Sequence, residues 1–542
     1  MLTFDVASTS PAHTVADVLV LPIFQGPEPG PGVAEVGEAL GADLISVLKD
    51  HRVMGKVGET FAVPSLGRVK ATSVVLVGLG PKGEAGAEAV RKASVKAARA
   101  AAKFRTLAST LPQVGDPAES GAAFAEGITI GGYRFDRYKV KSTENGSKGT
   151  GLRKAVALAG SATAARTLKN ALRRGRIYGE ASNWARDLVN TPAKDATPSY
   201  LAAEARRMAG KYGLKCRIWT KAELEKGGFG GILGVGAGSA NEPRLIELLY
   251  QGAGDDQPIG LTGKGVTFDS GGLSLKDAAA MEWMKADMGG AAAALATMRA
   301  VAQLGTKVNV IAAIPSSENL PGGSAIRPGD VLVHRSGKTS EVLNTDAEGR
   351  LILADALAYL AEKKPRVIIE SATLTGAAMV ALGTDIWAVM GNDQGLIDEL
   401  LDAGRRSGEP GWQLPLWADY KRNIESTVAD VKNTGPRYGG AINAGLFLKE
   451  FVGDVPWAHL DVAGTAFAET ASEWWPKGAT GSPARTFIRY IESQAKARIP
   501  AKAAGSRRRA SRPTGVASPG QPVGSKRATR ASGRGRASRP TA

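Results

Sequence analysis

Three short segments of the sequence place acidic residues where a strand ends or a helix begins. Asp269 follows an apolar stretch, Asp287 precedes an alanine-rich stretch, and Asp346 and Glu348 lie two residues apart before another apolar stretch. Four carboxylates gathered at one point would repel one another and resist ionisation unless cations balanced them. Two divalent metals carry the required charge, and a metal pair about 3–4 Å apart is an established device for hydrolysis.

Each acidic residue also has a simpler interpretation when it is considered alone. Asp287 could cap the helix that follows it, because Asp is favoured at that position. Asp346 and Glu348 could form an acidic turn or a cap, because the helix dipole favours negative charge at a helix start. The presence of all four residues in one α/β unit favours the metal interpretation.

Three basic residues, Lys264, Lys276 and Arg350, accompany these acids in the sequence. A lysine binds a metal only as a neutral amine, so Lys264 would need a depressed pKa, which burial and nearby cations both favour. Lys276 and Arg350 could stay charged and face the negative charge that develops on a substrate oxygen. The alternative is that all three only neutralise neighbouring acids.

The sequence excludes two common kinds of site, a phosphate-binding P-loop and a zinc site on a helix. The Gly263–Lys264 pair resembles a phosphate-binding P-loop, but Gly265 stands where Ser or Thr is required and Pro258 replaces the earlier glycine. The sequence contains no HExxH segment, which excludes the usual zinc-helix protease. We interpret His459 as a structural residue or as one that supports the site residues from behind, and His334 as a surface loop residue.

The segments that must position these residues alternate between strand-like and helix-like patterns. Strand-like apolar runs with little polar alternation span residues 259–268, 307–314, 366–374 and 458–464, and helix-like runs span 291–304 and 351–363. This alternation predicts a mainly parallel sheet covered by helices on both faces. In such folds, sites form at the carboxyl ends of the strands. Gly263 and Gly265 could distort the first strand so that Lys264 and Asp269 reach one point.

The N-terminal third predicts a smaller α/β unit. Residues 73–80 form an apolar run that ends in glycine, and residues 164–190 have a helical pattern that stops before prolines. The predicted organisation is an N-terminal α/β domain at 1–165, a linking helix at 166–190, a catalytic α/β domain at 191–493 and a disordered tail at 494–542.

The positive charge of the chain is concentrated in this tail. Residues 494–542 contain 13 Lys or Arg and no acid, so subtracting 13 from the net charge of +17 leaves +4 for the rest. A segment with so little to bury cannot offset its ordering entropy. It is either an inert solubilising extension or a nucleic-acid contact that neutralises phosphates. It lacks aromatic residues for base stacking, so sequence-specific reading is not expected.

The remaining sequence features favour a cytoplasmic protein without a membrane partner. Cys216 is the lone cysteine, which excludes an internal disulfide framework and fits a reducing compartment. The first residues show no basic and apolar signal pattern, and no run of 18 apolar residues occurs.

Four segments of the chain resemble the signature blocks of the leucine aminopeptidase (cytosol aminopeptidase) family: GKGVTFDSGGLSLK, MKADMGGAAA, NTDAEGRL and ATLTGA. The resemblance implies a hydrolase that removes N-terminal residues, preferably leucine-like, from peptides with free N-termini. It implies two zinc or manganese ions per subunit, a bicarbonate ion and a homohexamer. Some bacterial relatives also bind DNA, which gives the basic tail a precedent.

The resemblance also assigns roles to individual residues. It implies one metal held by Lys264, Asp269, Asp287 and Glu348, and a tighter one held by Asp269, Asp346 and Glu348. A water or hydroxide bridging the metals would attack the scissile carbonyl, Lys276 would stabilise the oxyanion, and Arg350 would position bicarbonate as general base. The implied substrate-binding residues are Met284, Thr373, Leu374, Gly376 and Ala463. The pattern assigns no role to Trp474 and Trp475.

Overall fold

The structure is a computed structural model that describes residues 2–140, 151–472 and 474–496. It contains two large mixed sheets, and each sheet with its covering helices forms one α/β unit. This arrangement confirms the predicted fold class of a smaller N-terminal and a larger C-terminal α/β unit. The tail predicted to be disordered begins at residue 494, but residues 494–496 are the end of helix α15 (Ala484–Lys496), and the rest of the tail lies outside the described residues.

The first sheet has seven strands, of which the four neighbouring pairs at its centre are parallel. In spatial order its strands are β1 (Thr3–Ala7), β7 (Lys154–Leu158), β6 (Thr106–Ser109), β2 (Val18–Phe24), β5 (Ser73–Gly78) and β4 (Thr60–Pro64), with β3 (Glu28–Pro29) beside β2. Helices α3 (Ala87–Ala100) and α4 (Pro117–Gly131) share a core with one face, and α1 (Val33–Leu40) and α2 (Leu44–Asp50) share a core with the other. Alternate residues of β2 therefore enter different cores, which explains why the whole strand is apolar.

The second sheet positions the candidate site. In spatial order its strands are β17 (Gly411–Gln413), β16 (Trp387–Gly391), β19 (Trp457–Asp461), β15 (Val367–Ala372), β10 (Ile259–Gly263), β12 (Asn309–Asn319), β9 (Arg244–Gln251) and β8 (Lys215–Trp219), with β11 (Gly265–Asp269) beside β12. The central pairs from β19 to β12 are parallel, whereas β16, β9 and β8 join in antiparallel fashion. The carboxyl ends of the central strands consequently meet at one edge.

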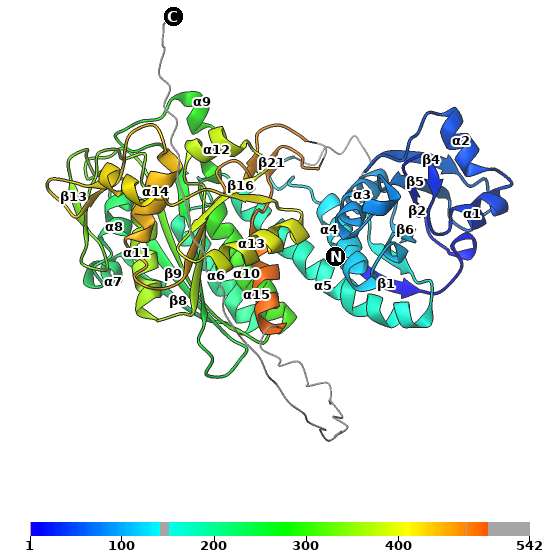
Figure 1. Cartoon of the computed structure of the whole chain (residues 1–542), viewed down its shortest axis with the longest axis horizontal. Coiled ribbons are helices and arrows are strands. Elements are labelled where there is room, and N and C mark those ends of the chain that lie inside the picture. Colours follow the sequence, from blue (N-terminus) through cyan, green and yellow to red (C-terminus); the bar gives the residue numbers. More distant parts are fainter. Residues whose placement is uncertain (1, 141–150, 473, 497–542) are drawn as a thin grey trace, which may run out of the picture. The chain divides into compact units, whose positions relative to one another are not determined.

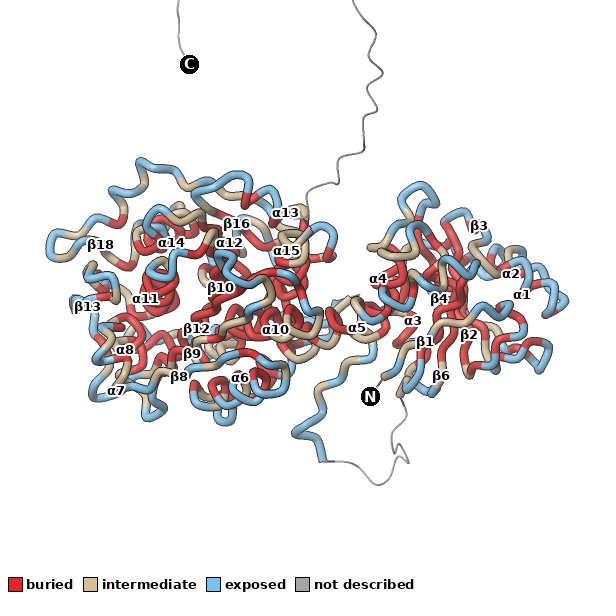
Figure 2. Tube along the Cα trace, turned by 90° about the horizontal axis from the view of Figure 1, so that it is seen from below, coloured by how far each residue is buried: buried red, intermediate tan, exposed pale blue. Residues whose placement is uncertain are grey.

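Helices cover both faces of this sheet. One core contains residues of α6 (Pro198–Tyr212), α10 (Gly289–Leu304), α13 (Gln394–Ser407) and α15 (Ala484–Lys496), and the other contains residues of α8 (Gly230–Gly236), α11 (Gly349–Glu362) and α14 (Gly440–Lys449). Figure 1 shows α10 and α15 side by side, and they are also in contact. Figure 2 shows the buried residues concentrated on β10, β12 and α10. This burial matches the apolar runs of the sequence.

The long helix α5 (Ala162–Asn190) contributes to the cores of both sheets. Ser161 caps its start by accepting a hydrogen bond from the backbone N–H of Ala164. Leu168 and Leu172 pack in the core of the first sheet, whereas Tyr178 packs in a core of the second. The helix ends just before the Thr191–Pro192 pair, as expected for a proline that cannot continue it.

Short elements complete the described chain. The short α-helices are α7 (Lys221–Lys226), α9 (Ala278–Met281) and α12 (Gly376–Leu382). The 3-10 segments are η1 (Pro11–His13), η2 (Lys82–Glu84), η3 (Leu111–Gln113), η5 (Met284–Ala286) and η6 (Ala418–Ile424). The small strands are β13 (Val331–Val333), β14 (Thr339–Glu341), β18 (Val431–Lys432), β20 (Phe467–Ala468) and β21 (Gly478–Ala479). In the part of the chain that the structure describes, no helix has the length and apolar character needed to cross a membrane.

The two histidines interpreted from the sequence are both buried. His459 is fully buried, and its Nδ1 lies 2.9 Å from Glu370 Oε1, so the structural interpretation agrees with its position. The surface interpretation of His334 is wrong, because only 1% of this residue is exposed. Its ring contacts Asp355 at 3.2 Å and Ser340 at 2.7 Å, and a polar residue in a short apolar segment gave no sign of these distant partners.

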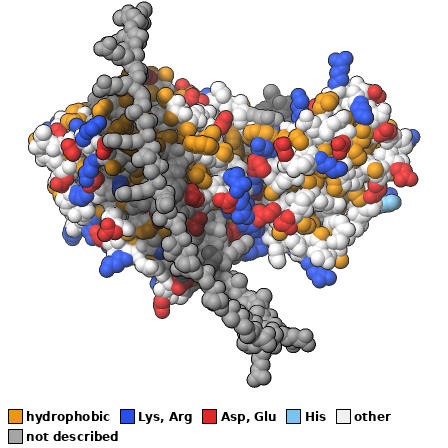
Figure 3. Space-filling view, viewed as in Figure 1, with side chains coloured by type: hydrophobic (Ala, Val, Ile, Leu, Met, Phe, Trp, Pro, Cys, Tyr) orange, Lys and Arg blue, Asp and Glu red, His pale blue; other side chains and the backbone are white. Residues whose placement is uncertain are grey.

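Charged residues on the described surface are mixed in sign. Lysine, arginine and acidic side chains are interspersed over the face that Figure 3 shows. This mixture agrees with the small net charge that remains when the basic tail is left out.

A buried ion cluster joins α4 to α15, a helix that packs on the second sheet. Glu126 on α4 is 1% exposed and lies 2.9 Å from both Arg91 Nε and Arg485 Nη1. Burial alone would raise the pKa of Glu126, but the two arginines outweigh burial and hold the pKa below its ordinary value of 4.5. Replacing Glu126 by Gln is therefore expected to destabilise the protein by about 3 kcal/mol, because two guanidinium groups lose a buried partner.

Urea unfolding followed by circular dichroism measures this effect, and Glu119→Gln is a matched control. Glu119 also contacts several arginines, but a third of its side chain is exposed, so its loss should cost less than about 1 kcal/mol. Because the folded pKa of Glu126 is lowered, its contribution is present above pH 4.5 and is lost as the pH falls through the folded pKa. Equal stability of the two variants at pH 7 would contradict this account.

Candidate active site

The strand that carries Lys264 is broken at that residue. β10 ends at Gly263 and β11 begins at Gly265, and between them the Lys264 backbone donates a hydrogen bond to Ser371 and accepts one from Ala291. A Cβ at Gly263 would lie 2.2 Å from the carbonyl oxygen of Gly290. The glycine is thus needed for close approach of the backbone of α10, and the break allows Lys264 and Asp269 to face one site.

The four predicted carboxylates converge on the two predicted lysines. Lys264 Nζ lies 2.8 Å from Asp287 Oδ1 and 2.7 Å from Glu348 Oε1. Lys276 Nζ lies 2.9 Å from Asp269 Oδ2 and also forms an ion pair with Asp346. One carboxylate oxygen each from Asp269, Asp346 and Glu348 lies within 4.8 Å of the others. Three segments far apart in the sequence therefore form one acidic cluster.

The helix-cap alternatives disagree with the geometry. Met288, and not Asp287, occupies the cap position of α10, and the Asp287 side chain instead accepts a hydrogen bond from Thr373 Oγ1 at 2.7 Å. Glu348 does occupy the cap position of α11, but its side chain accepts no capping hydrogen bond. Both carboxylates point away from the helix starts and toward the cluster.

The cluster carries an excess of negative charge. Its four carboxylates and the two lysines together have a formal charge of −2. Burial and the neighbouring acids raise the pKa of Asp287, and burial followed by Asp269 raises the pKa of Glu348. Burial alone would lower the pKa of Lys264, but the attraction of Asp287, Glu348 and Asp269 raises it above its ordinary value. A metal can bind Lys264 only when its amine is neutral. Loss of the Lys264 proton would therefore require the positive charge of the bound metal itself.

The donor set fits divalent metal ions. Asp287 Oδ2 and Glu348 Oε2 are buried and have no hydrogen-bond partner among the described residues. Unpartnered buried carboxylate oxygens are costly unless a cation satisfies them. Carboxylate oxygens with one amine nitrogen suit hard or borderline divalent ions such as manganese and zinc.

Asn319, which the sequence did not single out, orients one member of the cluster. Its side-chain amide donates to Asp269 Oδ1 at 2.8 Å and to the carbonyl of Thr345 at 3.0 Å. It thereby ties the end of β11 to the segment that carries Asp346. Its position at the end of β12 was the signal that sequence reasoning overlooked.

Asp461, at the end of β19, is a second residue that the sequence did not single out. Its carboxylate accepts hydrogen bonds from the backbone N–H of Leu374 and of Ala463, each at 3.2 Å, and from Thr375 Oγ1 at 2.7 Å. It therefore fixes the two loops that hold most of the predicted substrate-binding residues. An acid at the carboxyl end of a predicted parallel strand was the available signal.

Arg350 is buried near the cluster, but the hydrogen-bond partner of its guanidinium lies outside the cluster. Its Nη1 donates to the carbonyl of Asn433 at 2.8 Å, and the described residues include no carboxylate in an ion pair with it. Burial lowers the pKa of Arg350 to about 10, although Glu348 and Asp461 act in the opposite direction. The structure thus provides a buried cation beside the cluster.

A cavity of about 800 Å³ opens onto the acidic cluster. Its walls include Lys264, Lys276, Asp269, Asp287 and Asp346, together with all five predicted substrate-binding residues, Met284, Thr373, Leu374, Gly376 and Ala463. Trp475 also lines it, while the neighbouring Trp474 packs under Lys92 and Lys96 of α3. The cavity can therefore hold an organic ligand next to metal ions bound by the acidic cluster.

Two family profiles match the chain. The profile described as "Cytosol aminopeptidase family, catalytic domain" matches residues 183–488, and that described as "Cytosol aminopeptidase family, N-terminal domain" matches residues 20–142. The chain belongs to the cytosol aminopeptidase family. Membership of this family makes the protein a peptide hydrolase of the metal-dependent aminopeptidase class.

Individual relatives of the cytosol aminopeptidase family agree with this assignment. A "Probable cytosol aminopeptidase" of Streptomyces griseus is 45% identical over 506 residues, which cover 90% of this chain and 98% of the relative. One of Geobacter sp. is 42% identical over 490 residues, covering 90% and 99%. Among solved structures, the bottromycin maturation enzyme BotP in complex with Mn is 37% identical with a TM-score of 0.79, covering 89% of this chain and all of BotP. A mutant of tomato leucine aminopeptidase is 31% identical with a TM-score of 0.80, covering 91% and 97%.

Proposed function

We propose that this protein is a leucyl aminopeptidase that uses two divalent metal ions, manganese or zinc, to remove leucine-like N-terminal residues from peptides. The observation that carries the proposal is the convergence of four carboxylates and Lys264 from three distant segments, with buried oxygens that have no hydrogen-bond partner among the described residues. The manganese complex of the similar BotP structure supports manganese as one candidate.

In this proposal the two metals share part of the donor set. One would be held by Lys264, Asp269, Asp287 and Glu348, and the other by Asp269, Asp346 and Glu348. When bound, the metals would act as Lewis acids and lower the pKa of a water molecule. Asn319 would keep Asp269 in position, and Thr373 would do the same for Asp287.

Lys276 and Arg350 would handle the charge and the proton of the reaction. Lys276 faces the cavity, and its pKa is raised because Asp269 and Asp346 outweigh the effect of burial, so it stays cationic at neutral pH. It would polarise the scissile carbonyl and stabilise the oxyanion. Arg350, a buried cation, would hold bicarbonate close to the cluster as the general base.

Several broader assignments accompany this proposal. We propose the domain division 1–165, 166–190 and 191–493 with a tail at 494–542, a cytoplasmic location and a homohexamer. The matched ranges 20–142 and 183–488 support the domain division, and the description of the family as cytosol aminopeptidases supports the location. The homohexamer is what the resemblance of the sequence to this family implies.

Peptide hydrolysis with and without a chelator tests the proposed activity. The purified protein should release leucine from Leu-Gly-Gly, and removal of metal should abolish this release until Mn²⁺ or Zn²⁺ is added back. N-acetyl-Leu-Gly-Gly should not be cleaved, because the free α-amino group is part of the proposed recognition. Chelator-insensitive cleavage, or cleavage of the acetylated peptide, would contradict the proposal.

The width of the substrate cavity at Gly376 gives a prediction about specificity. A Cβ added at Gly376 meets no heavy atom within 4 Å, yet the residue lines the cavity. Gly376→Leu is therefore expected to fill space that a leucine-like substrate side chain needs, and to lower kcat/KM for leucyl peptides by roughly tenfold or more relative to alanyl peptides.

Gly323→Leu is the matched control for this change. Gly323 is exposed, also has open space at its Cβ, and does not line the cavity. Its variant should hydrolyse both peptides like the unmodified protein. An unchanged ratio of leucyl to alanyl hydrolysis in Gly376→Leu would show that the side chain of the first residue binds elsewhere.

We propose a second function, non-specific nucleic-acid binding, for the basic tail. The proposal is supported by the composition of residues 494–542, which include 13 Lys or Arg residues and no acidic residue. Binding of duplex DNA should weaken steeply with salt, because Lys and Arg release counterions from phosphates. A protein ending at Lys496, where α15 ends, should lose this binding. Equal binding by the shortened protein would exclude the tail.

A further inference from the structure

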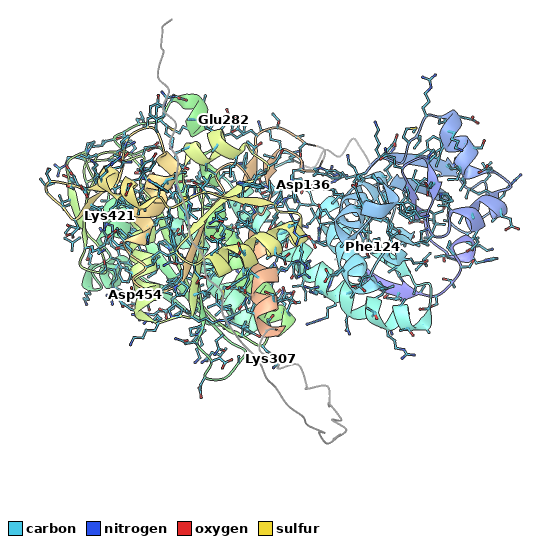
Figure 4. The ribbon with its side chains drawn as sticks, in the orientation of Figure 1. Phe124, Asp136, Glu282, Lys307, Lys421 and Asp454 are labelled. Atoms are coloured by element: carbon cyan, nitrogen blue, oxygen red, sulfur yellow. The ribbon has the colours of Figure 1, made fainter. Side chains whose placement is uncertain are left out.

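A second cavity, of about 810 Å³, lies on the other side of one wall of the active-site cavity. The shared wall consists of Trp283 and Phe467, which line both cavities and whose ring centroids are 5.6 Å apart. The other walls come from residues 133–139, from the end of α5 and from residues 476–478. We call this space the basic cavity. Figure 4 labels Asp136 and Glu282, which lie on its rim and are exposed.

The basic cavity has more cations than anions in its walls. Its basic residues are Arg134, Lys139, Arg186, Lys285 and Lys477, and its acidic residues are Asp136 and Glu282. Among the described residues, none of the five cations forms an ion pair with a carboxylate. The side chains of the walls therefore carry a net formal charge of +3, which no anionic group of the cavity balances.

Arg186 is the cation whose burial costs the most free energy, because only 1% of this residue is exposed. Its Nε donates to the carbonyl of Ala479 at 2.9 Å and its Nη1 to Asn183 Oδ1 at 3.2 Å, so both acceptors are neutral. Nη2 has no acceptor among the described residues. Burial lowers the pKa of Arg186 to about 10, as expected for a guanidinium without a carboxylate partner.

The guanidinium of Arg186 is also held in place. It lies 3.7 Å from the ring centroid of Tyr133, and the Tyr133 hydroxyl donates to Asp187 Oδ1 at 2.9 Å and accepts from Asn190 Nδ2 at 3.1 Å. An arginine fixed in this way presents its free N–H groups in a constant direction. Such a planar fork suits carboxylate and phosphate oxygens.

Two lysines add donors from another direction. Lys285 Nζ donates to the carbonyl of Asn190 at 3.2 Å, which leaves most of its N–H groups for another acceptor. Lys477 Nζ lies 4.2 Å from the ring centroid of Trp283, on the wall shared with the active site. Arg186, Lys285 and Lys477 thus come from three segments and line one cavity.

We propose that the basic cavity binds a small organic anion bearing a phosphate or carboxylate group. Such a ligand would supply the counterion that the walls lack, and the volume is in the usual range for small-molecule sites. Because Trp283 and Phe467 line both cavities, a ligand in this site would contact the same two side chains that border the active-site cavity. The inference does not depend on the proposed peptidase activity.

Isothermal titration calorimetry at constant ionic strength tests this proposal with two probes, inorganic phosphate and glutarate. At least one probe should bind, and the double variant Lys285→Gln/Lys477→Gln should bind it at least about tenfold more weakly, since each replaced lysine removes a charge-assisted contact. The matched control is Lys221→Gln/Lys226→Gln, which removes two exposed lysines of α7 outside the basic cavity and should bind normally.

The two probes distinguish the possible sources of the anion. Binding of phosphate alone would assign a phosphorylated ligand, and binding of glutarate alone would assign a carboxylic acid; either result supports the site. Binding of neither probe would overturn the proposal. Binding that is equally strong in Lys285→Gln/Lys477→Gln would also overturn it, because the anion would then sit elsewhere, for example at the metals.

Discussion

Replacing Glu348 by Gln is expected to lower kcat for leucyl peptides by about a thousandfold or more, which corresponds to about 4 kcal/mol. Glu348 is fully buried, and its Oε1 lies 2.7 Å from Lys264 Nζ. It is proposed to contact both metals, so a neutral amide weakens two sites at once. The amide group also brings N–H donors to a place where only acceptors are useful.

Metal content and activity should fall together in this variant. Metal analysis after dialysis should find fewer than two ions per subunit, while circular dichroism shows a folded protein. The control is Glu362→Gln on the same helix, because Glu362 contacts Arg335 at the surface, away from the acidic cluster. Full activity of Glu348→Gln, or a normal metal content with no activity, would contradict the proposed role.

Replacing Lys276 by Met is expected to lower kcat by about a hundredfold to a thousandfold with little change in KM. Methionine keeps the length of the side chain but removes the charge proposed to stabilise the oxyanion. Lys276 is not a proposed metal ligand, so both ions should remain bound. This combination separates the Lys276 variant from the Glu348 variant.

A conservative change gives the control for Lys276. Lys276→Arg retains a cation between Asp269 and Asp346, and should therefore retain more activity than Lys276→Met. The measurement is steady-state hydrolysis of Leu-Gly-Gly at saturating substrate with metal content checked in parallel. If Lys276→Met raised KM and left kcat unchanged, the residue would bind the substrate without acting on the transition state.

The fold and the acidic cluster were largely predictable because their signals are local. The apolar runs of β10, β12, β15 and β19 indicated buried parallel strands, and Asp269, Asp287, Asp346 and Glu348 were recognisable from their places at element ends. The break at Lys264 was also foreseen from its flanking glycines. Each of these signals lies within a few residues of the feature that it predicts.

Features that depend on long-range contacts were not predictable. Asn319 acts through Asp269, which is 50 residues away, and Asp461 acts through a loop 86 and 87 residues away. The burial of His334 depends on Asp355, and the place of Trp475 depends on how the chain returns past the active-site cavity. A single sequence gives no record of which distant residues meet.

Arg485 lines the active-site cavity and at the same time pairs with Glu126 of α4. The catalytic region is therefore not a self-contained module that could be excised or recombined freely. A fragment that begins after α5 would lack Glu126, and Arg485 in the wall of its cavity would keep an ion pair with Glu409 alone. Recombining the catalytic region without α4 would therefore remove one of the two carboxylates that hold Arg485 in this wall.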